Sequence, residues 1–413
     1  MAAGLGFKTF TTGEVLTAAD TNGYLMQGVL VFADAAARDA AITSPQEGQM
    51  AYLKSDDAIY KYTGVSWTNI DTTGGSAVNK NYLINGGFVV AQRGTSFTST
   101  GSANNDDAYT LDRWYILSDG NDIIDVTQDT TTVPTNGEFA IALDVETINK
   151  KFGIATIIEN KDVTGLVGNT VTFSFKAKVS ATTKLDNVKA AIVAWSGTAD
   201  TVTSDIISAW GVEGTNPTLI ANATYENTPA NLSLTTSYAS YSISAAVDTA
   251  STQNLILFIW SDVTDTTLGD FLYIAESKLE LGSSATAFVY AGGTFGGELA
   301  ACQRYLPAFT TGDSAGDIGV GMCNQTISAI IAMKLPTTAR VAPTGITVSA
   351  ATDFALRGSN GAAITASAVS FNTGSKDIIS INVTVASGVV AGDATLLYRL
   401  STNSRILMTG CEL

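Results

Sequence analysis

Acidic side chains are the main candidates for chemistry in this chain, because it contains no histidine. Without imidazole, Ser-His-Asp and Cys-His nucleophilic sites, histidine zinc sites and an imidazole general base are all excluded. Two carboxylates about 5–9 Å apart would still suffice to hydrolyse a glycan. The sequence alone does not show which carboxylates lie close enough together to act as such a pair. We therefore interpret them as solvated surface groups and expect no enzymatic activity. The candidates are Glu138, Asp144, Glu146 and Glu159.

Turns rich in asparagine and aspartate are the segments that suggest a metal. Asn104–Asp107 reads NNDD and Asp119–Asp125 reads DGNDIID, and Ca²⁺ takes several oxygen ligands. Neither segment has the regular ligand spacing of a known calcium loop, and Asn and Asp commonly bond their own backbone in turns. We therefore expect no cofactor, with a structural Ca²⁺ as the alternative. Three scattered cysteines, too few for a disulfide scaffold, are expected to be reduced and buried: Cys302, Cys323 and Cys411.

Aromatic side chains are the candidates for binding a sugar, since sugar rings stack their apolar faces on Trp or Tyr. Trp195 and Trp260 end apolar runs and are expected to pack in a core. Trp114 is interpreted as a packed strand residue that the stem of Arg113 covers. Two aromatic residues flank a polar segment, residues 211–223, and are the predicted ligand-binding residues: Trp210 and Tyr225.

The elements that position these residues are expected to be strands. Charged residues make up only 15% of the chain, and 38 glycines stand against 7 prolines, a composition typical of short strands joined by tight turns. The net charge of −16 repels phosphate backbones, so we expect no nucleic-acid partner. No apolar run approaches the ~20 residues of a transmembrane helix and no signal-peptide pattern is visible, so we expect no membrane insertion.

The first 70 residues are predicted to form a small α+β module. Residues 17–27 and 33–42 favour short helices, with Asp20 and Asp34 as their expected caps. Residues 48–70 alternate apolar and polar side chains around two turns, which predicts a three-stranded meander. Because such a unit is too small to be stable alone, its aromatic residues are expected to pack against a neighbouring copy or a partner: Tyr52, Tyr60, Tyr62 and Trp67.

A linker is predicted at residues 71–79, which are rich in Gly, Ser and Thr. Two β domains follow it, at residues 80–305 and 306–413. Strand-length runs favour a β-sandwich in the first domain; they lie at 170–179, 190–195, 237–247, 254–260 and 271–281. The C-terminal domain is also predicted to be a β-sandwich, from runs at 326–335, 345–349, 378–385, 395–400 and 405–408.

An ordered set of short motifs marks the start and end of the central domain. The motifs are Asn85-Gly86, Asp112-Arg113-Trp114, Leu279-Glu280-Leu281-Gly282, Ala285-Thr286 and Cys302-Gln303-Arg304-Tyr305. In this order they resemble the lectin-like jelly-roll module of bacteriophage tail fibres and related virion appendages. The resemblance implies a jelly-roll, carbohydrate-binding-like fold for residues 80–305.

Weaker resemblances extend to both ends of the chain. Gly13–Leu16, Asn22–Leu25 and Gly64–Trp67 resemble the N-terminal module that many phage structural proteins place before a fibre body. Residues 333–343 and the terminal Cys411–Leu413 resemble the closing domain of such fibres. The N-terminal resemblance implies that residues 1–70 dock the chain to other virion proteins, with Tyr52, Tyr60, Tyr62 and Trp67 as the candidate contacts.

Together these resemblances imply a virion structural protein: a phage tail fibre or fibre adaptor that attaches the particle to a host surface glycan or receptor. They also imply a homotrimer, assembled in the cytoplasm of the host bacterium. Since no heptad run exists, sandwich faces and the N-terminal meander are expected to hold the trimer. A head fibre or capsid-decorating protein is the alternative within the virion, and a glycan depolymerase is the alternative from another class.

Overall fold

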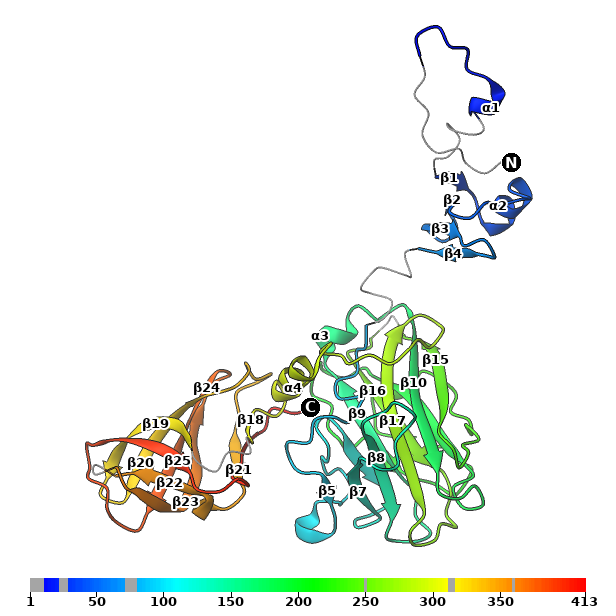
Figure 1. Ribbon diagram of the computed structural model, residues 1–413. Helices are drawn as coiled ribbons and strands as arrows, with labels where there is room; N and C mark the ends of the chain where they lie inside the picture. Colours follow the sequence, from blue (N-terminus) through cyan, green and yellow to red (C-terminus); the bar gives the residue numbers. More distant parts are fainter. Residues whose placement is uncertain (1–10, 22–28, 71–79, 249–250, 311–315, 359–360) are drawn as a thin grey trace. The chain divides into compact units, whose positions relative to one another are not determined.

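The structure is a computed structural model that describes residues 11–21, 29–70, 80–248, 251–310, 316–358 and 361–413. Contacts divide the chain into two compact units, Met1–Val78 and Asn79–Leu413. Strands dominate the described residues, which confirms the mostly β prediction (Figure 1). The predicted linker at 71–79 lies outside the described residues. The predicted boundary at residue 305 lies inside the second unit, between α4 (Phe295–Gln303) and β18 (Ala308–Phe309).

A four-stranded sheet in the order β1-β2-β3-β4 forms most of the first unit. The predicted meander is confirmed, and it consists of β2 (Met50–Leu53), β3 (Ala58–Tyr62) and β4 (Trp67–Asn69). The sequence did not predict β1 (Leu30–Phe32), which pairs with β2 in parallel. Three residues are too short a run to show an alternation by themselves.

Two short helices accompany this sheet. Asp34 caps α2 (Ala35–Ala41) as predicted, and its carboxylate accepts a hydrogen bond from the Ala37 N–H. The predicted cap role of Asp20 is wrong, because Thr17 caps α1 (Ala18–Asp20). Asp20 instead closes a capping box from the third helical position, since its carboxylate accepts the Thr17 N–H.

Two antiparallel sheets in the second unit form the predicted sandwich. The six-stranded sheet comprises, in order, β15 (Ala239–Ala246), β10 (Thr170–Val179), β17 (Phe271–Leu281), β8 (Ala140–Val145), β7 (Ile124–Asp129) and β5 (Ser96–Phe97). The five-stranded sheet comprises, in order, β14 (Ala223–Tyr225), β11 (Val188–Trp195), β16 (Asn254–Ser261), β9 (Phe152–Ile158) and β6 (Tyr115–Ser118). A single apolar core lies between them and includes Phe173, Leu257 and Ile274.

Periodicity along the strands explains which sheet face each residue takes. In β10, Val171, Phe173 and Phe175 point into the core, and polar residues alternate with them. All eight residues of β16 are buried, because this strand is covered on both faces. A second apolar cluster accounts for that cover: Phe258 and Trp260 pack against residues of the long excursion between β11 and β14. The excursion carries the hairpin of β12 (Ile207–Ala209) and β13 (Thr218–Leu219).

The C-terminal part of the second unit is a closed barrel with its own core. Its strands are, in order, β19 (Gly316–Gln325), β20 (Ser328–Lys334), β24 (Ile378–Val385), β23 (Ala363–Gly374), β22 (Phe354–Arg357) and β25 (Ala394–Arg399). A three-stranded sheet joins it, made of β18, β26 (Ile406–Thr409) and β21 (Gly345–Val348). The prediction of a C-terminal sandwich is therefore wrong in its architecture. Alternating inward and outward residues fit a sandwich and a barrel equally well, so the pattern does not reveal closure.

Candidate ligand-binding face

The first motifs that mark the sandwich in sequence contain buried structural residues, including Asn85, Asp112 and Trp114. The Asn85 side chain donates to the backbone oxygens of Val90 and Asp112 at 2.9 and 2.8 Å, and the Trp114 indole donates to the Asn85 oxygen at 3.1 Å. The Asp112 carboxylate accepts the side-chain and backbone N–H groups of Gln92 at 2.6 and 2.7 Å. These bonds hold the start of the sandwich together.

The Cys-Gln-Arg-Tyr motif completes the same buried network from α4. Arg304 makes a bidentate contact with the Glu159 carboxylate at 2.8 and 3.2 Å, and the Tyr305 hydroxyl donates to it at 2.7 Å. The Arg113 guanidinium lies 3.7 Å from the centroid of the Tyr305 ring. Glu159, a candidate catalytic carboxylate in the sequence, is thus a structural ion-pair partner. These bonds lower the pKa of its carboxyl against the opposing effect of burial.

A buried ion pair links the Leu-Glu-Leu-Gly motif to the Ala-Thr motif that follows it. Lys278 and Glu280 lie 3.0 Å apart with fully buried side chains. Glu280 accepts the N–H and hydroxyl of Thr286, and Lys278 donates to the Thr286 hydroxyl and the Ala287 oxygen. The pair therefore fixes the segment 285–288 where it crosses the six-stranded sheet.

The two predicted ligand-binding residues pack in the cluster that covers the five-stranded sheet. The Trp210 ring meets Phe258 edge to face at a centroid distance of 6.0 Å. The Tyr225 hydroxyl donates to the Pro217 oxygen at 2.8 Å, and its ring lies 6.5 Å from Trp260. Burial raises the pKa of Tyr225. Both side chains are only partly exposed, and their role in binding remains a prediction.

A buried lysine holds the loop that carries Trp210. The Lys151 ammonium donates to the backbone oxygens of Val212 and Thr215 at 2.7 and 2.9 Å, and of Trp210 at 3.3 Å. It also pairs with the fully buried Asp262, which Lys189 contacts at 2.6 Å. Because a buried charge needs such partners, this loop is fixed rather than free to adapt to a ligand.

In the first unit, the predicted docking aromatics divide between the two faces of the sheet. The buried Arg38 guanidinium lies 5.5 Å from the Tyr60 ring and 4.7 Å from the Trp67 ring, and Tyr62 packs against Trp67. The Tyr52 hydroxyl donates to Asp57. Tyr52 pairs with Val31 on the opposite face, where Val31 and Met50 are exposed.

Part of the outer face of the six-stranded sheet lies beyond the segment 285–288 that crosses it, and several side chains there are exposed or partly exposed. We define the open face by the outward residues of β15, β10 and β17: Ser240, Ser242, Ser174, Lys176, Lys178, Tyr273 and Phe271. The Phe271 and Tyr273 rings lie side by side, 5.4 Å apart and only 14° from parallel. The Lys178 ammonium is 5.4 Å from the Tyr273 centroid.

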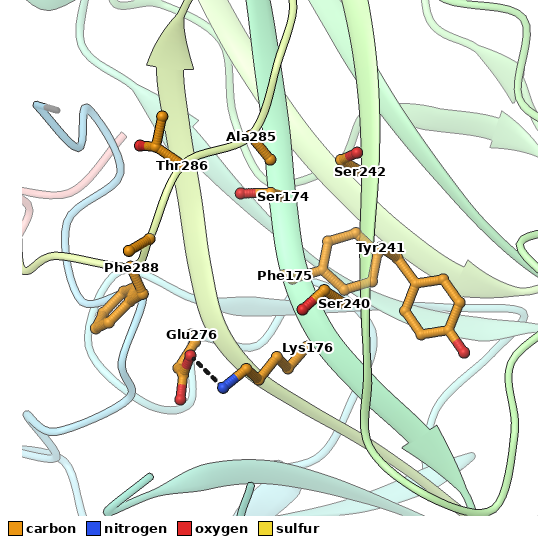
Figure 2. Close-up of a pocket in the computed structure, with 11 residues that line it drawn as sticks. Ser174, Phe175, Lys176, Ser240, Tyr241, Ser242, Glu276, Ala285, Thr286 and Phe288 are labelled. Atoms are coloured by element: carbon orange, nitrogen blue, oxygen red, sulfur yellow. Dashed lines mark ion pairs between the residues drawn. The ribbon is translucent and has the colours of Figure 1, made fainter. Parts of the chain in front are cut away.

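A cavity of about 400 Å³ occupies one end of the open face. Figure 2 shows Ser174, Ser240 and Ser242 along its strands and the crossing segment with Ala285, Thr286 and Phe288 beside it. Lys176 and Glu276 form an ion pair of 2.8 Å at this site. Glu276 lies at a bulge in β17 and has a φ of 49°, which directs its carboxylate toward β10. Hydroxyls and one ion pair thus line this concave site together with apolar and aromatic side chains, including Phe175, Tyr241 and Phe288.

Acidic residues extend the same sheet surface beyond Phe271. Asp144 pairs with Phe271 on one side and Asp125 on the other. Burial raises the pKa of Asp144 to about 6, and the carboxylates of Glu146, Asp125 and Asp270 add to the shift. Asp144 is thus the one sequence candidate for carboxylate chemistry that lies beside the open face; Glu138 and Glu146 are exposed or partly exposed and stand outside this face.

The structure brings together the two segments considered for calcium. The Asn104 amide donates to Asp122 and Asp125 at 2.7 and 2.9 Å, and Asp106 accepts the Ser118 N–H at 2.7 Å. No cluster of three or more His, Cys, Asp or Glu side chains suited to a metal occurs among the residues that the structure describes. The three cysteines are free and buried. No helix in the described ranges is long and apolar enough to cross a membrane.

Comparison with known proteins gives only distant structural likenesses. No protein-family profile and no curated protein matches the chain. The enzymatically active domain of bacteriophage CBA120 tailspike protein 4 is similar over 49% of this chain and 21% of its own, at 15% identity and a TM-score of 0.28. A CBM4 module is similar over 48% of this chain and 98% of its own, at 13% identity and a TM-score of 0.25. The CBM22-1 xylan-binding domain of Paenibacillus barcinonensis Xyn10C is similar over 51% of this chain and 100% of its own, at 12% identity and a TM-score of 0.27. The chain spans about a fifth of the tailspike chain.

Proposed function

We propose that this chain is a bacteriophage attachment protein, a tail fibre or fibre adaptor, and that it binds a host surface glycan through the open face. One observation carries the proposal: stacked aromatic rings and a hydroxyl-lined cavity share the partly exposed outer surface of a rigid sheet. Sugars present apolar ring faces and hydroxyls, so they need aromatic platforms next to donors and acceptors. The side chains of the open face supply both.

A binding experiment tests this assignment. The probe is a printed array of bacterial surface polysaccharides, incubated with the labelled full chain. On a glycan that binds the wild type, Tyr273→Ala should weaken binding by about tenfold or more, because it removes a stacking platform worth about 1.4 kcal/mol. Tyr398→Ala is the matched control, because Tyr398 stacks on Arg357 in the barrel and is remote from the open face. Equal binding by both variants would refute the proposal.

The same glycan also tests the alternative that the protein is a glycan depolymerase. The proposal of a binder without enzymatic activity predicts adsorption without release of reducing ends. Asp144 is the residue to test for a catalytic role, since a carboxyl with a raised pKa beside aromatic rings suits a general acid. Release of reducing ends that Asp144→Asn abolishes would replace the binding assignment with a hydrolase.

We further propose that the first unit docks the protein to other virion proteins and that the assembled protein is a homotrimer. The exposed Val31 and Met50, beside Tyr52, place apolar side chains next to Lys61 on a face that a partner would cover. A chain that starts at Asn79 should remain folded and soluble but be absent from purified particles. Its normal incorporation would place docking elsewhere. Gold labelling of particles would also separate a tail location from a head fibre or capsid-decorating protein.

A further inference from the structure

An exposed apolar patch lies on the outside of the C-terminal barrel. Strand register places Met322 between Ala394 and Ile330, and Val320 between Leu396 and Ala332. We name these six residues the barrel patch. Val320, Met322 and Ile330 are 61%, 54% and 37% exposed, although the alternate residues of the same strands point into the barrel core. Six adjacent outward positions without one polar side chain are unusual on an exposed β surface.

Charge is absent from the patch itself and from β24 on one side of it, whereas β22 on the other side carries Arg357, which forms an ion pair with Asp317. The register continues to Asn382 and Ser380 on β24, which carry polar but uncharged side chains. The nearest charged residues along the three strands stand at the rim, one to three positions beyond the patch: Asp317, Lys334 and Asp393. An apolar centre with a polar rim is the arrangement found in protein interfaces, where methionine is also enriched.

The chemistry of the barrel patch excludes several occupants. It offers no aromatic ring and no hydrogen-bonding side chain, so a glycan would gain little there. The barrel is closed, so its strands have no free edge to which an extended peptide could add. An occupant of the patch would therefore be the apolar side chains of another folded surface.

A second copy of this chain fits the patch best. Each copy carries a net charge of −16, so contact between copies is repulsive wherever carboxylates face one another. The uncharged patch is a surface on which copies meet without burying like charges. The patch spans three strands about 4.8 Å apart, and each strand contributes two outward residues about 7 Å apart along its length. Its width is therefore about 15 Å. This is less than the ~800 Å² per partner of a stable interface, so the patch would form its centre and the uncharged β24 residues its extension.

We propose that the barrel patch is a contact between copies of this chain, at which Val320, Met322 and Ile330 of one copy pack against a second copy. This assignment differs from the expectation that sandwich faces and the N-terminal meander hold the oligomer. It does not depend on the glycan-binding role of the open face.

Sedimentation of the full chain over a range of concentrations tests the contact. Met322→Lys should weaken self-association by about tenfold or more, because the new ammonium would be buried without a partner. Val390→Lys is the control: Val390 is similarly exposed, at 56%, in a loop of the same barrel outside the patch, and it gives the same charge change. Its association should match that of the wild type. Added salt should strengthen wild-type association by screening the repulsion between acidic copies.

Cross-linking gives a second readout that does not require a disruptive variant. Met322→Cys should form a disulfide between copies on mild oxidation, and Val390→Cys should not; the three native cysteines are buried. A wild type that stays monomeric at about 100 μM overturns the proposal, since even weak association is populated there. Oligomers unaffected by Met322→Lys also overturn it. Loss of binding to a host protein by a monomeric Met322→Lys variant would reassign the patch to a different partner. Glycan binding should be unchanged in every case.

Discussion

The two outer faces of the sandwich differ in how far other parts of the chain cover them, although the same core lies between their sheets. On the five-stranded sheet, β16 is apolar on both sides, and the excursion between β11 and β14 covers it. On the six-stranded sheet, β10 alternates apolar and polar residues, and its outward Lys176 and Lys178 remain partly exposed. A continuous apolar strand therefore marks a face that another layer hides. An alternating strand marks a face available to a ligand.

The largest expected effect separates covered from uncovered aromatic residues. Trp260 is fully buried and stacks on Phe258 at 4.5 Å under the excursion. Trp260→Ala should lower the free energy of unfolding by about 3–5 kcal/mol through the cavity that it leaves. Tyr273→Ala, on the open face, should lower it by about 1 kcal/mol or less. Urea unfolding of both variants gives the comparison, and equal losses would mean that the open face is as tightly packed as the covered one.

Variants of two adjacent lysines, Lys150 and Lys151, test what fixes the excursion between β11 and β14. Lys151→Met leaves three backbone oxygens without their donor, and it should lower the free energy of unfolding by about 3 kcal/mol, while Lys189 still pairs with Asp262. Lys150→Met removes an exposed ion pair with Asp119 and should change the free energy of unfolding by less than about 1 kcal/mol. Limited proteolysis should cut the Lys151 variant near Val212. Resistance of that loop would show that its own packing, not the lysine, fixes it.

A smaller effect is expected at Tyr225, where packing and binding make different predictions. Tyr225→Phe removes the bond to the Pro217 oxygen and should lower the free energy of unfolding by about 1 kcal/mol. If Tyr225 belongs only to the cover, polysaccharide binding should stay at the wild-type level, and Trp210→Ala should likewise reduce stability rather than binding. Reduced binding at unchanged stability would support the ligand-binding role predicted from the sequence.

Titration of Asp144 should give a change in stability that depends on pH. Its pKa is raised to about 6 in the folded state, so the folded protein binds this proton more tightly than the unfolded chain. The free energy of unfolding should therefore fall as pH rises from about 4 to about 6 and be level above that range. Asp144→Asn should remove this slope from thermal unfolding measured across the window. Asp107→Asn is the comparison, because the Asp107 pKa of about 7 extends the corresponding window to higher pH.

Strand positions were largely predictable from the sequence, and the candidate site was not. β10, β16 and β17 follow clear alternating or continuous apolar runs, whereas β19 was missed because Gly319 and Gly321 interrupt its pattern. Gly321 is needed there, since a Cβ would lie 2.0 Å from the Ile330 oxygen. The open face is built of serines, lysines and two ordinary aromatics that single positions do not distinguish. It becomes recognisable only when register brings Tyr273 next to Lys178 and Ser174 next to Ser242.

The last residues of the sequence have a consequence for the order of folding. Glu412 pairs with Arg93, the Leu413 oxygen accepts the Tyr109 hydroxyl, and Arg405 donates to the Arg93 oxygen. These partners are more than 300 residues apart in the chain, and Leu413 belongs to the apolar cluster on the five-stranded sheet. These contacts can therefore form only after the whole barrel sequence has been synthesised, whereas the core between the two sheets is complete by Leu279. A chain cut short anywhere in the barrel would lack Leu413 and leave the apolar cluster on the five-stranded sheet without one of its members.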